Sequence, residues 1–548
     1  MTDAAKKEQH TPRRKLFFLH SWVGFNFALF MMLVVMTGTF AVIADEIDWL
    51  IHPELRVEVG TEKVSWGTMA RAVREYAPHD AMTMLSAGEG DYFAHRATMT
   101  DTTGRRYYLY VDPWTGEVTG TTSALTVQRF LRDLHRYLFM PSAIGLPLVS
   151  TLAVVLIISL YTGLKTARRW WRSATRIRLN RGIRIFMGDS HRAVGLWAVW
   201  FIALVAVTGL WYFAELAFAI GGTRFEPPRP GIDAERVETL APVSPHADPD
   251  ALIASVHEVF PELEPVEIQF AYGMTLASTV LGFTDDPLVR KRANRVFLDP
   301  FDASVIKVQR SPSLGWVAYL NEIADPLHFG FFGGLTTKII WFVFGLGLLT
   351  LSFSGVWLTW RRVKSRSPST YQLATLPLFA IVAVVGSFYV ARFLPEEVTL
   401  KEQLPVTSNA PMQTQLFVVT DDGTPTGEFR IVLRSNEGRI NLQTAEVTIG
   451  ADRQVLEPSL LGRHVTLTGE LPEGTSGAPA VVVATFRFPG GQTFESRWRL
   501  SNDSAHARHH VIEYAARAPR RRDRLAPRLE TDLPRLVMAG SANGSGAR

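Results

Sequence analysis

Five stretches of the chain are long and apolar enough to cross a lipid bilayer, and this feature limits the possible folds more than any other. A spanning helix needs about 20 apolar residues, because the hydrocarbon core is about 30 Å thick. The stretches are about Leu16–Ala44, Leu146–Leu164, Ala193–Phe218, Ile339–Trp360 and Leu373–Val390. The first is too long for a signal peptide and no convincing cleavage site follows it, so we expect it to be retained.

Basic residues gather in three segments that alternate with the predicted spans. These segments are Lys6–Lys15, Arg168–Arg184 and Arg361–Arg366. Because short loops rich in Lys and Arg stay in the cytoplasm, the segments between them should face the opposite side, which in a bacterium is the periplasm. We therefore expect a multi-pass membrane protein, which in a bacterium lies in the inner membrane, with a cytoplasmic N-terminus. The net charge of +5 is modest for 548 residues, and we expect no nucleic-acid partner.

The first and third spans repeat the same pattern of polar and small residues. One carries His20, Gly24, Thr37 and Gly38, and the other carries His191, Gly195, Thr208 and Gly209 at the same spacings. The second and fourth spans match more loosely, since His135 precedes Gly163 by 28 residues and His328 precedes Gly355 by 27. Self-similarity of this kind indicates an internal repeat.

The segments between the spans of each half also match. Tyr107–Val118 and Asn294–Val305 both run from alternating apolar residues into Asp-Pro, which opens a turn. We predict a membrane protein that is mainly α, with two repeated units of helix, α+β outer domain and helix. A fifth span and a C-terminal β-rich domain follow, with short alternating runs over about Thr407–Leu500 that are typical of a small sandwich or barrel.

The predicted boundaries follow from these patterns. They are 1–14 (cytoplasmic tail), 15–44 (first span), 45–142 (first outer domain), 143–167 (second span), 168–190 (basic cytoplasmic loop), 191–218 (third span), 219–335 (second outer domain), 336–360 (fourth span), 361–371 (cytoplasmic loop), 372–393 (fifth span), 394–505 (β-rich outer domain) and 506–548 (basic, disordered tail).

Four histidines lie at membrane boundaries inside the repeat, at two depths. His20 and His191 are expected on the cytoplasmic side, and His135 and His328 on the outer side. One interpretation is that each merely anchors a helix end in the interface. The other is that each pair holds the iron of one haem b from opposite faces, an arrangement that favours electron transfer over oxygen chemistry.

The repeated glycines fit the haem interpretation. Gly24 and Gly195 lie one turn beyond a histidine on the same helix face, where a bare backbone leaves room for a flat macrocycle. On a straight helix Gly38 lies 18 residues and about 27 Å beyond His20, near the outer pair, and Gly209 repeats this. Small-residue helix packing is the alternative explanation of the same glycines, and both can be true, since close helices can still hold a haem between them.

The absence of cysteine restricts the cofactors. It excludes disulfides, thiolate-held clusters and covalently attached haem, which needs Cys-x-x-Cys-His. Haem or metal held by histidine remains possible. Arg132, Arg136 and Lys338 are candidates to neutralise haem propionates, and interfacial anchoring is the alternative for all three.

At this point the chain resembles the PepSY-associated transmembrane-helix proteins. The matching stretches run in order over about residues 15–362 and include LHSWVGF, YVDPWTGEV, LHRYLF, SHRAVGLW, LDPFDASV and LHFGFFGG. The resemblance implies PepSY-like outer domains, and the four histidines fall on the family's histidine positions. The second turn lacks the Thr-Gly of the first and reads Phe301-Asp302-Ala303, so the two outer domains need not be equivalent.

Members of this family are associated with iron uptake, and some are ferric-siderophore reductases with two haems b. The resemblance therefore implies electron transfer from the haem of His20 and His191 to that of His135 and His328, and then to a periplasmic ferric siderophore or other Fe(III) chelate. The donor is not encoded, and a cytosolic reductase or a membrane quinol remains open. The alternatives are a haem-binding or haem-transport protein without reductase activity, and a PepSY interaction module that regulates a partner.

Overall fold

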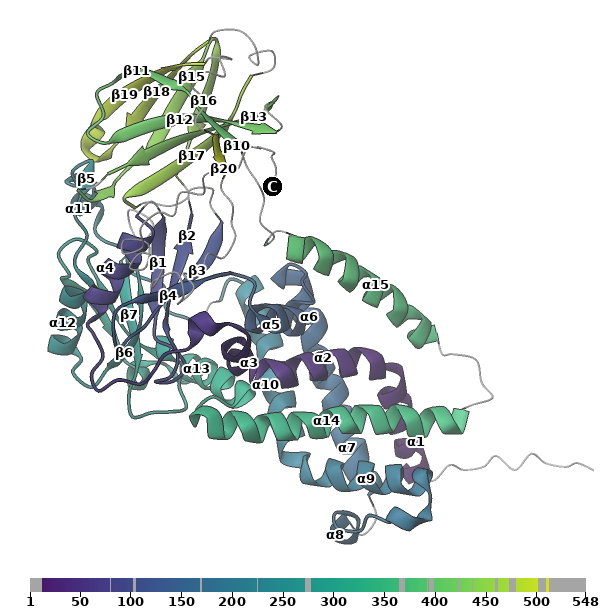
Figure 1. The fold of residues 1–548 in the computed structure, drawn as a ribbon. Helices are drawn as coiled ribbons and strands as arrows, with labels where there is room; N and C mark the ends of the chain where they lie inside the picture. Colours follow the sequence, from purple (N-terminus) through teal and green to yellow (C-terminus); the bar gives the residue numbers. More distant parts are fainter. Residues whose placement is uncertain are drawn as a thin grey trace, which may run out of the picture.

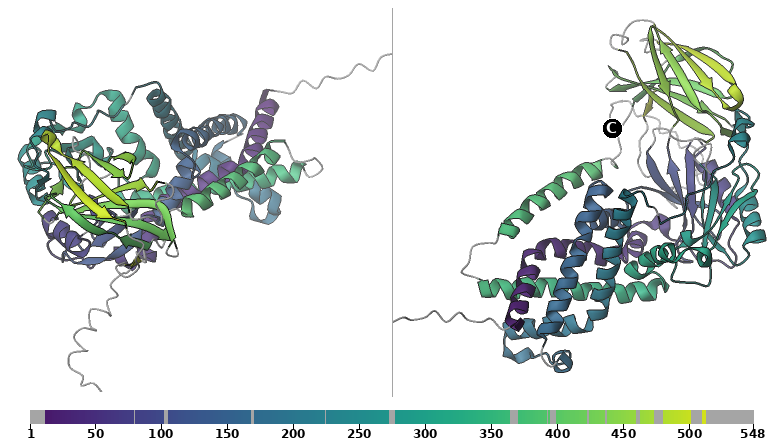
Figure 2. Two further views of the ribbon diagram at one scale, coloured as in Figure 1. Left: turned by 90° about the horizontal axis from the view of Figure 1, so that it is seen from above. Right: turned by 180° about the vertical axis from the view of Figure 1, so that it is seen from behind.

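The structure is a computed structural model, and it consists of a helical bundle, a sheet layer and a β-sandwich that follow one another in space (Figures 1 and 2). It describes residues 12–78, 80–101, 105–167, 170–223, 225–271, 277–363, 370–391, 393, 399–421, 424–435, 437–458, 462–472, 480–500 and 509–511. Most of the predicted N-terminal and C-terminal tails lies outside the described residues.

The helices occur in both halves of the chain, and most of the long ones belong to the bundle. They are α1 (Pro12–Asn26), α2 (Ala28–Ala41), α3 (Ala44–Ile51), α4 (Trp66–Tyr76), α5 (Val127–Tyr137), α6 (Ser142–Ser150), α7 (Leu152–Thr166), α8 (Trp170–Ser173), α9 (Ile183–Trp197), α10 (Val199–Ile220), α11 (Ala234–Glu238), α12 (Pro249–Val259), α13 (Trp316–Phe329), α14 (Gly334–Val363) and α15 (Thr370–Ala391). Short 3₁₀ helices are η1 (Pro53–Leu55), η2 (Leu179–Arg181), η3 (Lys291–Ala293), η4 (Ser311–Ser313) and η5 (Pro489–Gly491).

Within the described part of the chain, three helices are long and apolar enough to span a membrane. They are Ser142–Thr166, Val199–Ile220 and Gly334–Arg362, and a fourth span is made if α1 and α2 together cross once. The predicted fifth span falls in α15. The portion of α15 whose side chains are described, Phe379–Ala391, is apolar but shorter than a span.

The first span is not straight, which corrects the expected separation of about 27 Å along one axis. The chain bends by 66° between α1 and α2, at Phe27. Just before the bend, the buried Asn26 side chain donates to the Trp22 carbonyl at 2.8 Å and so competes with the helix ladder. A break at Ala198 separates α9 from α10 at the matching place in the third span.

The strands of the two outer segments form one antiparallel sheet of eight strands rather than two separate sheets. Its order is β4-β3-β2-β1-β6-β7-β8-β9. The strands are β1 (Ala81–Ser86), β2 (His95–Thr100), β3 (Arg106–Val111), β4 (Val118–Ser123), β6 (Glu264–Gln269), β7 (Ser278–Phe283), β8 (Asn294–Leu298) and β9 (Val305–Gln309). β1 and β6 join the halves through pairs such as Leu85↔Ile268. This pairing removes two exposed strand edges.

The helices α4 and α12 pack against this sheet. Met69 and Val73 of α4 share one apolar cluster with Leu252 and Val256 of α12 and with strand residues of both halves, including Ile268. The spacing of three and four residues along each helix makes the buried stripe. The core of the layer therefore combines both halves of the chain.

The two Asp-Pro turns have the same conformation despite their different sequences. Asp112 accepts from the Trp114 amide at 2.8 Å, and Asp299 accepts from the Phe301 amide at 2.8 Å. Gly116 has φ of 75°, and Ala303, in the matching place, has φ of 61°. Alanine is held there in a left-handed conformation that costs it about 1–2 kcal/mol, so the missing glycine does not change the turn.

The C-terminal domain is a β-sandwich of two five-stranded sheets, ordered β17-β13-β12-β10-β20 and β11-β19-β18-β15-β16. Its strands are β10 (Thr399–Glu402), β11 (Leu404–Ser408), β12 (Gln413–Asp421), β13 (Thr424–Arg434), β15 (Thr444–Ile449), β16 (Asp452–Leu456), β17 (His464–Glu470), β18 (Val481–Arg487), β19 (Thr493–Arg499) and β20 (His509–Val511). Buried Phe429, Phe486 and Trp498 fill the space between the sheets. A short pairing of β5 (Val243–Ser244) with β14 (Arg439–Ile440) ties the sandwich to the sheet layer.

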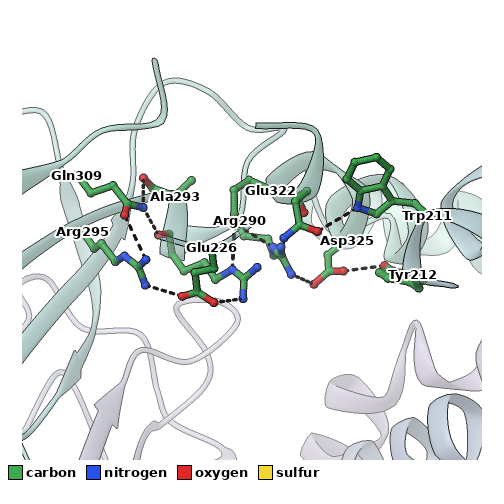
Figure 3. A network of polar contacts seen from close by, with 11 residues as sticks. Trp211, Tyr212, Glu226, Arg290, Ala293, Arg295, Gln309, Glu322 and Asp325 are labelled. Carbon is green, nitrogen blue, oxygen red and sulfur yellow. Dashed lines mark hydrogen bonds and ion pairs between the residues drawn. The ribbon is translucent and has the colours of Figure 1, made fainter. Parts of the chain in front are cut away.

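A chain of ion pairs connects the sheet layer with the bundle (Figure 3). Glu322 of α13 accepts from Arg290 at 3.0 Å and from Arg292 at 3.1 Å, and its side chain is only 5% exposed. Arg292 and Arg295 both donate to Glu226. The carboxylate of Glu322 thus holds two arginines at the boundary of the two layers.

Glu322→Gln is expected to destabilise the protein by about 3 kcal/mol, because two partly buried arginines lose their shared carboxylate. The change should appear as a lower Tm of the detergent-purified protein. Glu262→Gln is the matched control, since Glu262 also pairs with an arginine, Arg310, but is 56% exposed. Such surface pairs contribute about 0–1 kcal/mol, so an equal loss of Tm in both variants would contradict the assigned role.

Candidate functional site

The four histidines lie in two pairs inside the structure. His20 of α1 and His191 of α9 form the first pair, with ring centroids 6.2 Å apart and ring planes at 77°. His135 of α5 and His328 of α13 form the second pair, with centroids 6.2 Å apart and planes at 45°. The helices of the first pair, α1 and α9, meet at the end of the bundle away from the sheets, whereas α5 and α13 lie near the sheet layer (Figure 1).

The Nδ1 atom of each histidine contacts a carbonyl or hydroxyl oxygen. His20 lies 3.1 Å from Ser159 O, and His135 lies 2.8 Å from Val34 O. A carbonyl can only accept, so Nδ1 carries the proton in both rings. The Nε2 atom of each therefore keeps a free lone pair, which is the form that binds a metal.

The other member of each pair is held in the same tautomer through a hydroxyl. His191 Nδ1 lies 2.9 Å from Ser354 Oγ, and this hydroxyl donates to Thr350 O at 2.7 Å. His328 Nδ1 lies 2.7 Å from Thr208 Oγ1, which donates to Leu204 O at 2.8 Å. Because each hydroxyl donates its hydrogen to a backbone carbonyl, its oxygen accepts from Nδ1–H of the histidine. Within the described residues, Nε2 of none of the four rings makes a hydrogen bond.

A cavity opens beside each pair. The cavity at the first pair has a volume of about 500 Å³, and that at the second about 140 Å³. Both are lined mainly by apolar side chains. Both are lined by Met31, Val35, Leu156 and Leu348, so one apolar wall separates the two cavities.

The predicted glycines line these cavities, Gly24 and Gly195 the first and Gly38 and Gly209 the second. A Cβ atom on Gly24 would meet nothing within 4 Å, and one on Gly195 would lie 3.6 Å from Leu351. A Cβ on Gly38 would lie 2.5 Å from the His135 ring, whereas one on Gly209 would lie 3.3 Å from Ala153. The missing side chain of Gly38 is therefore needed to accommodate the His135 ring.

Several residues of the site were not singled out from the sequence. Gly163 lies against His20 and Gly355 against His191, each with a Cβ-to-ring distance of 3.4 Å. Their spacing from His135 and His328 marked the repeat, and this same signal would have found them. Thr208 was recognised only as a repeated residue, and the role of Ser354 as a histidine partner depends on a contact between distant helices.

The arginines and the lysine considered from the sequence differ in their placement. Arg136 lines the second cavity. Arg132 lies 3.8 Å from Asp133, and Lys338 pairs with Glu46 at 3.1 Å, Glu89 at 3.4 Å and Asp45 at 3.8 Å. Lys338 therefore joins α14 to α3 and to the sheet layer. Two arginines not considered before, Arg192 and Arg362, line the first cavity.

In the described ranges, no group of three or more His, Asp or Glu side chains could hold a metal ion. The two histidine pairs each bring two imidazoles together. They define a class of membrane protein in which facing imidazoles lie inside a helical bundle beneath an α+β sheet layer.

The chain belongs to the family of the PepSY-associated TM region, whose model matches residues 17–362, more than half of the 548 residues. The match contains both histidine pairs and the eight-stranded sheet, and it ends before α15 and the β-sandwich. A search of the curated proteins finds no match.

Proposed function

We propose that this protein is a di-haem electron-transfer protein of the bacterial inner membrane. In this proposal His20 and His191 hold one haem b and His135 and His328 hold a second. Electrons from a cytosolic reductase or a quinol cross the membrane to reduce a periplasmic ferric complex, such as a ferric siderophore. The observation that carries the proposal is the ring separation of 6.2 Å in both pairs.

This separation fits two imidazoles that share one iron. An imidazole nitrogen binds a metal at about 2 Å and lies about 1 Å from its own ring centre, so two such rings have centres roughly 6 Å apart. The free Nε2 lone pairs and the apolar cavities beside the two pairs, of about 500 and about 140 Å³, also support the proposal. A haem b held by these histidines would supply one-electron transfer between Fe(III) and Fe(II).

The protein's own groups would orient the ligands and exclude water. The Nδ1–H bonds to Ser159, Val34, Ser354 and Thr208 fix each ring plane and make Nε2 a stronger donor. The apolar wall shared by the two cavities keeps water out between the pairs. Arg192 and Arg362 at the first cavity, and Arg136 at the second, are placed to neutralise carboxylates of a bound ligand.

We also propose that the chain consists of two repeated units with their PepSY-like segments in the periplasm. Supporting this, strands of the first half and strands of the second half meet at β1 and β6, and the sheet order is symmetric about that contact. The breaks at Phe27 and Ala198 stand in matching places after His20 and His191. The orientation depends on the basic segments alone.

The function is tested with protein reduced anaerobically and freed of excess reductant. Adding a ferric hydroxamate complex should reoxidise the haem spectrum and release about one Fe(II) per haem, as one electron is carried by each iron. The gallium complex of the same chelator is the control, because gallium(III) is not reduced and should leave the spectrum unchanged.

Two other outcomes would favour other functions. Stable haem that no ferric chelate reoxidises would indicate a haem-binding or haem-transport protein. Colourless protein from haem-replete cells would contradict the proposal and favour a PepSY interaction module.

A further inference from the structure

The helix α15 lies outside the region matched by the family, yet one of its faces contacts the helix that carries His135. Val382, Gly386 and Tyr389 follow one another at spacings of four and three residues and share this face. The end of α15 that carries them lies beside α5 and α6 (Figure 1). Val382 belongs to the same buried cluster as Val34 and Leu138. Through this cluster α15 packs near Val34, whose carbonyl contacts the His135 ring, and near Leu138, in the turn that follows His135.

Tyr389 is the centre of this contact and is only 6% exposed. Its hydroxyl donates to Asp133 Oδ2, and Arg129 Nε donates to the same carboxylate at 3.2 Å. Its ring stacks on Phe139 with centroids 4.7 Å apart and planes at 24°. Asp133 and Phe139 lie on either side of His135 in the chain, so one side chain of α15 holds the backbone at both positions.

The turn that Tyr389 covers is conformationally strained. Leu138 and Phe139 both have positive φ, at 52° and 61°. Non-glycine residues in this conformation cost about 1–2 kcal/mol each and persist where surrounding contacts enforce them. Gly386 provides one such contact, because a Cβ there would come within 3.0 Å of the Phe139 ring. The end of α5 thus depends on α15 for its packing.

The other half of the chain has an equivalent arrangement without α15 (Figure 3). Tyr212 of α10 donates to Asp325 at 2.7 Å, and Arg290 donates to the same carboxylate at 2.6 Å. Burial alone would raise the pKa of Asp325, but Arg290 and the Tyr212 hydroxyl hold that pKa below its ordinary value. Asp325 lies one turn before His328. Each histidine of the second pair is therefore preceded by an aspartate that binds an arginine and a tyrosine.

The repeat shows why the first half needs a tyrosine from elsewhere. Ala41 stands as far beyond His20 as Tyr212 stands beyond His191. The first unit thus has a methyl group where the second has a phenol. The hydroxyl that donates to Asp133 belongs to Tyr389 of α15 instead. We propose that α15 completes the second histidine pair and that Tyr389 is a positioning residue for His135. The haem part of this inference rests on the proposed function, and the contact of α15 with α5 does not.

The first measurement is independent of haem. Hydrogen exchange of the α5 peptide is compared in the full-length wild type and in Tyr389→Phe. Loss of one hydrogen bond to a charged group should let α5 open about tenfold more often. Tyr161→Phe is the control, because Tyr161 is 55% exposed on α7 and lines neither cavity. Unchanged hydrogen exchange in α5 would show that Tyr389 does not stabilise α5, whether or not haem is bound, and would overturn the proposal.

The second measurement concerns the ligand. In haem-loaded Tyr389→Phe the midpoint potential and electron paramagnetic resonance signal of one haem should shift, while those of the other stay as in wild type. Tyr212→Phe should move the same haem and speed exchange in α13 instead of α5. Faster α5 exchange with both haem signals unchanged would overturn the positioning role. Wild-type protein without haem would refute the proposed function. Hydrogen exchange of α5 would still test whether Tyr389 of α15 stabilises α5.

Discussion

Replacing His328 with alanine is expected to lower the haem content of the purified protein from two to about one per chain. The second site would keep one imidazole, from His135. A site with a single protein ligand should bind haem much more weakly than one with two. His20→Ala should remove the other haem and leave the second site intact. A pyridine haemochrome assay with the protein concentration measured on the same sample gives the stoichiometry.

The pattern across variants decides the assignment. His257→Ala is the control, since His257 lies exposed on α12, away from both pairs. The double variant His20→Ala with His328→Ala should bind no haem. Full haem content after either single substitution would exclude that histidine as a ligand, and loss of both haems from His257→Ala would show that the assay reports misfolding.

Gly38→Ala is expected to remove the second haem while the first remains. The added methyl group would lie 2.5 Å from His135 Cε1, far inside contact distance, and the ring is held by its bond to Val34. Overpacking at a tightly packed position costs about 1–3 kcal/mol when neighbours must shift. Here the shift moves a ligand, so the loss should appear in haem content and in the spectrum of one haem.

Gly347→Ala is the matched control in the same bundle. Its methyl group would meet Val194 at 3.4 Å, an ordinary contact, and Gly347 lines neither cavity. This variant should keep two haems. If Gly38→Ala also kept two haems with wild-type spectra, His135 would not have the position that the second site requires.

The histidine pairs illustrate how far sequence reasoning reaches. The matched spacing of His20 with His191, and the looser match of His135 with His328, predicted which rings share a depth. In the structure these are the rings that lie 6.2 Å apart. The expected position of Gly38 near the second pair also agrees with the structure, but through a bent helix. The straight-helix argument was wrong because the chain bends by 66° at Phe27, where hydropathy shows only an apolar run.

Apolar spans and the pairing of the histidines were readable from the sequence because hydropathy, spacing and residue type are local properties of the chain. The joining of both outer segments into one sheet could not be predicted, because the sequence of an edge strand does not indicate which strand it will pair with. The placement of Tyr389 against Asp133 was also hidden, since it links residues more than 250 positions apart. Such contacts are decided by which surfaces meet on folding, and only the tertiary structure shows that α15 contacts the helix that carries His135.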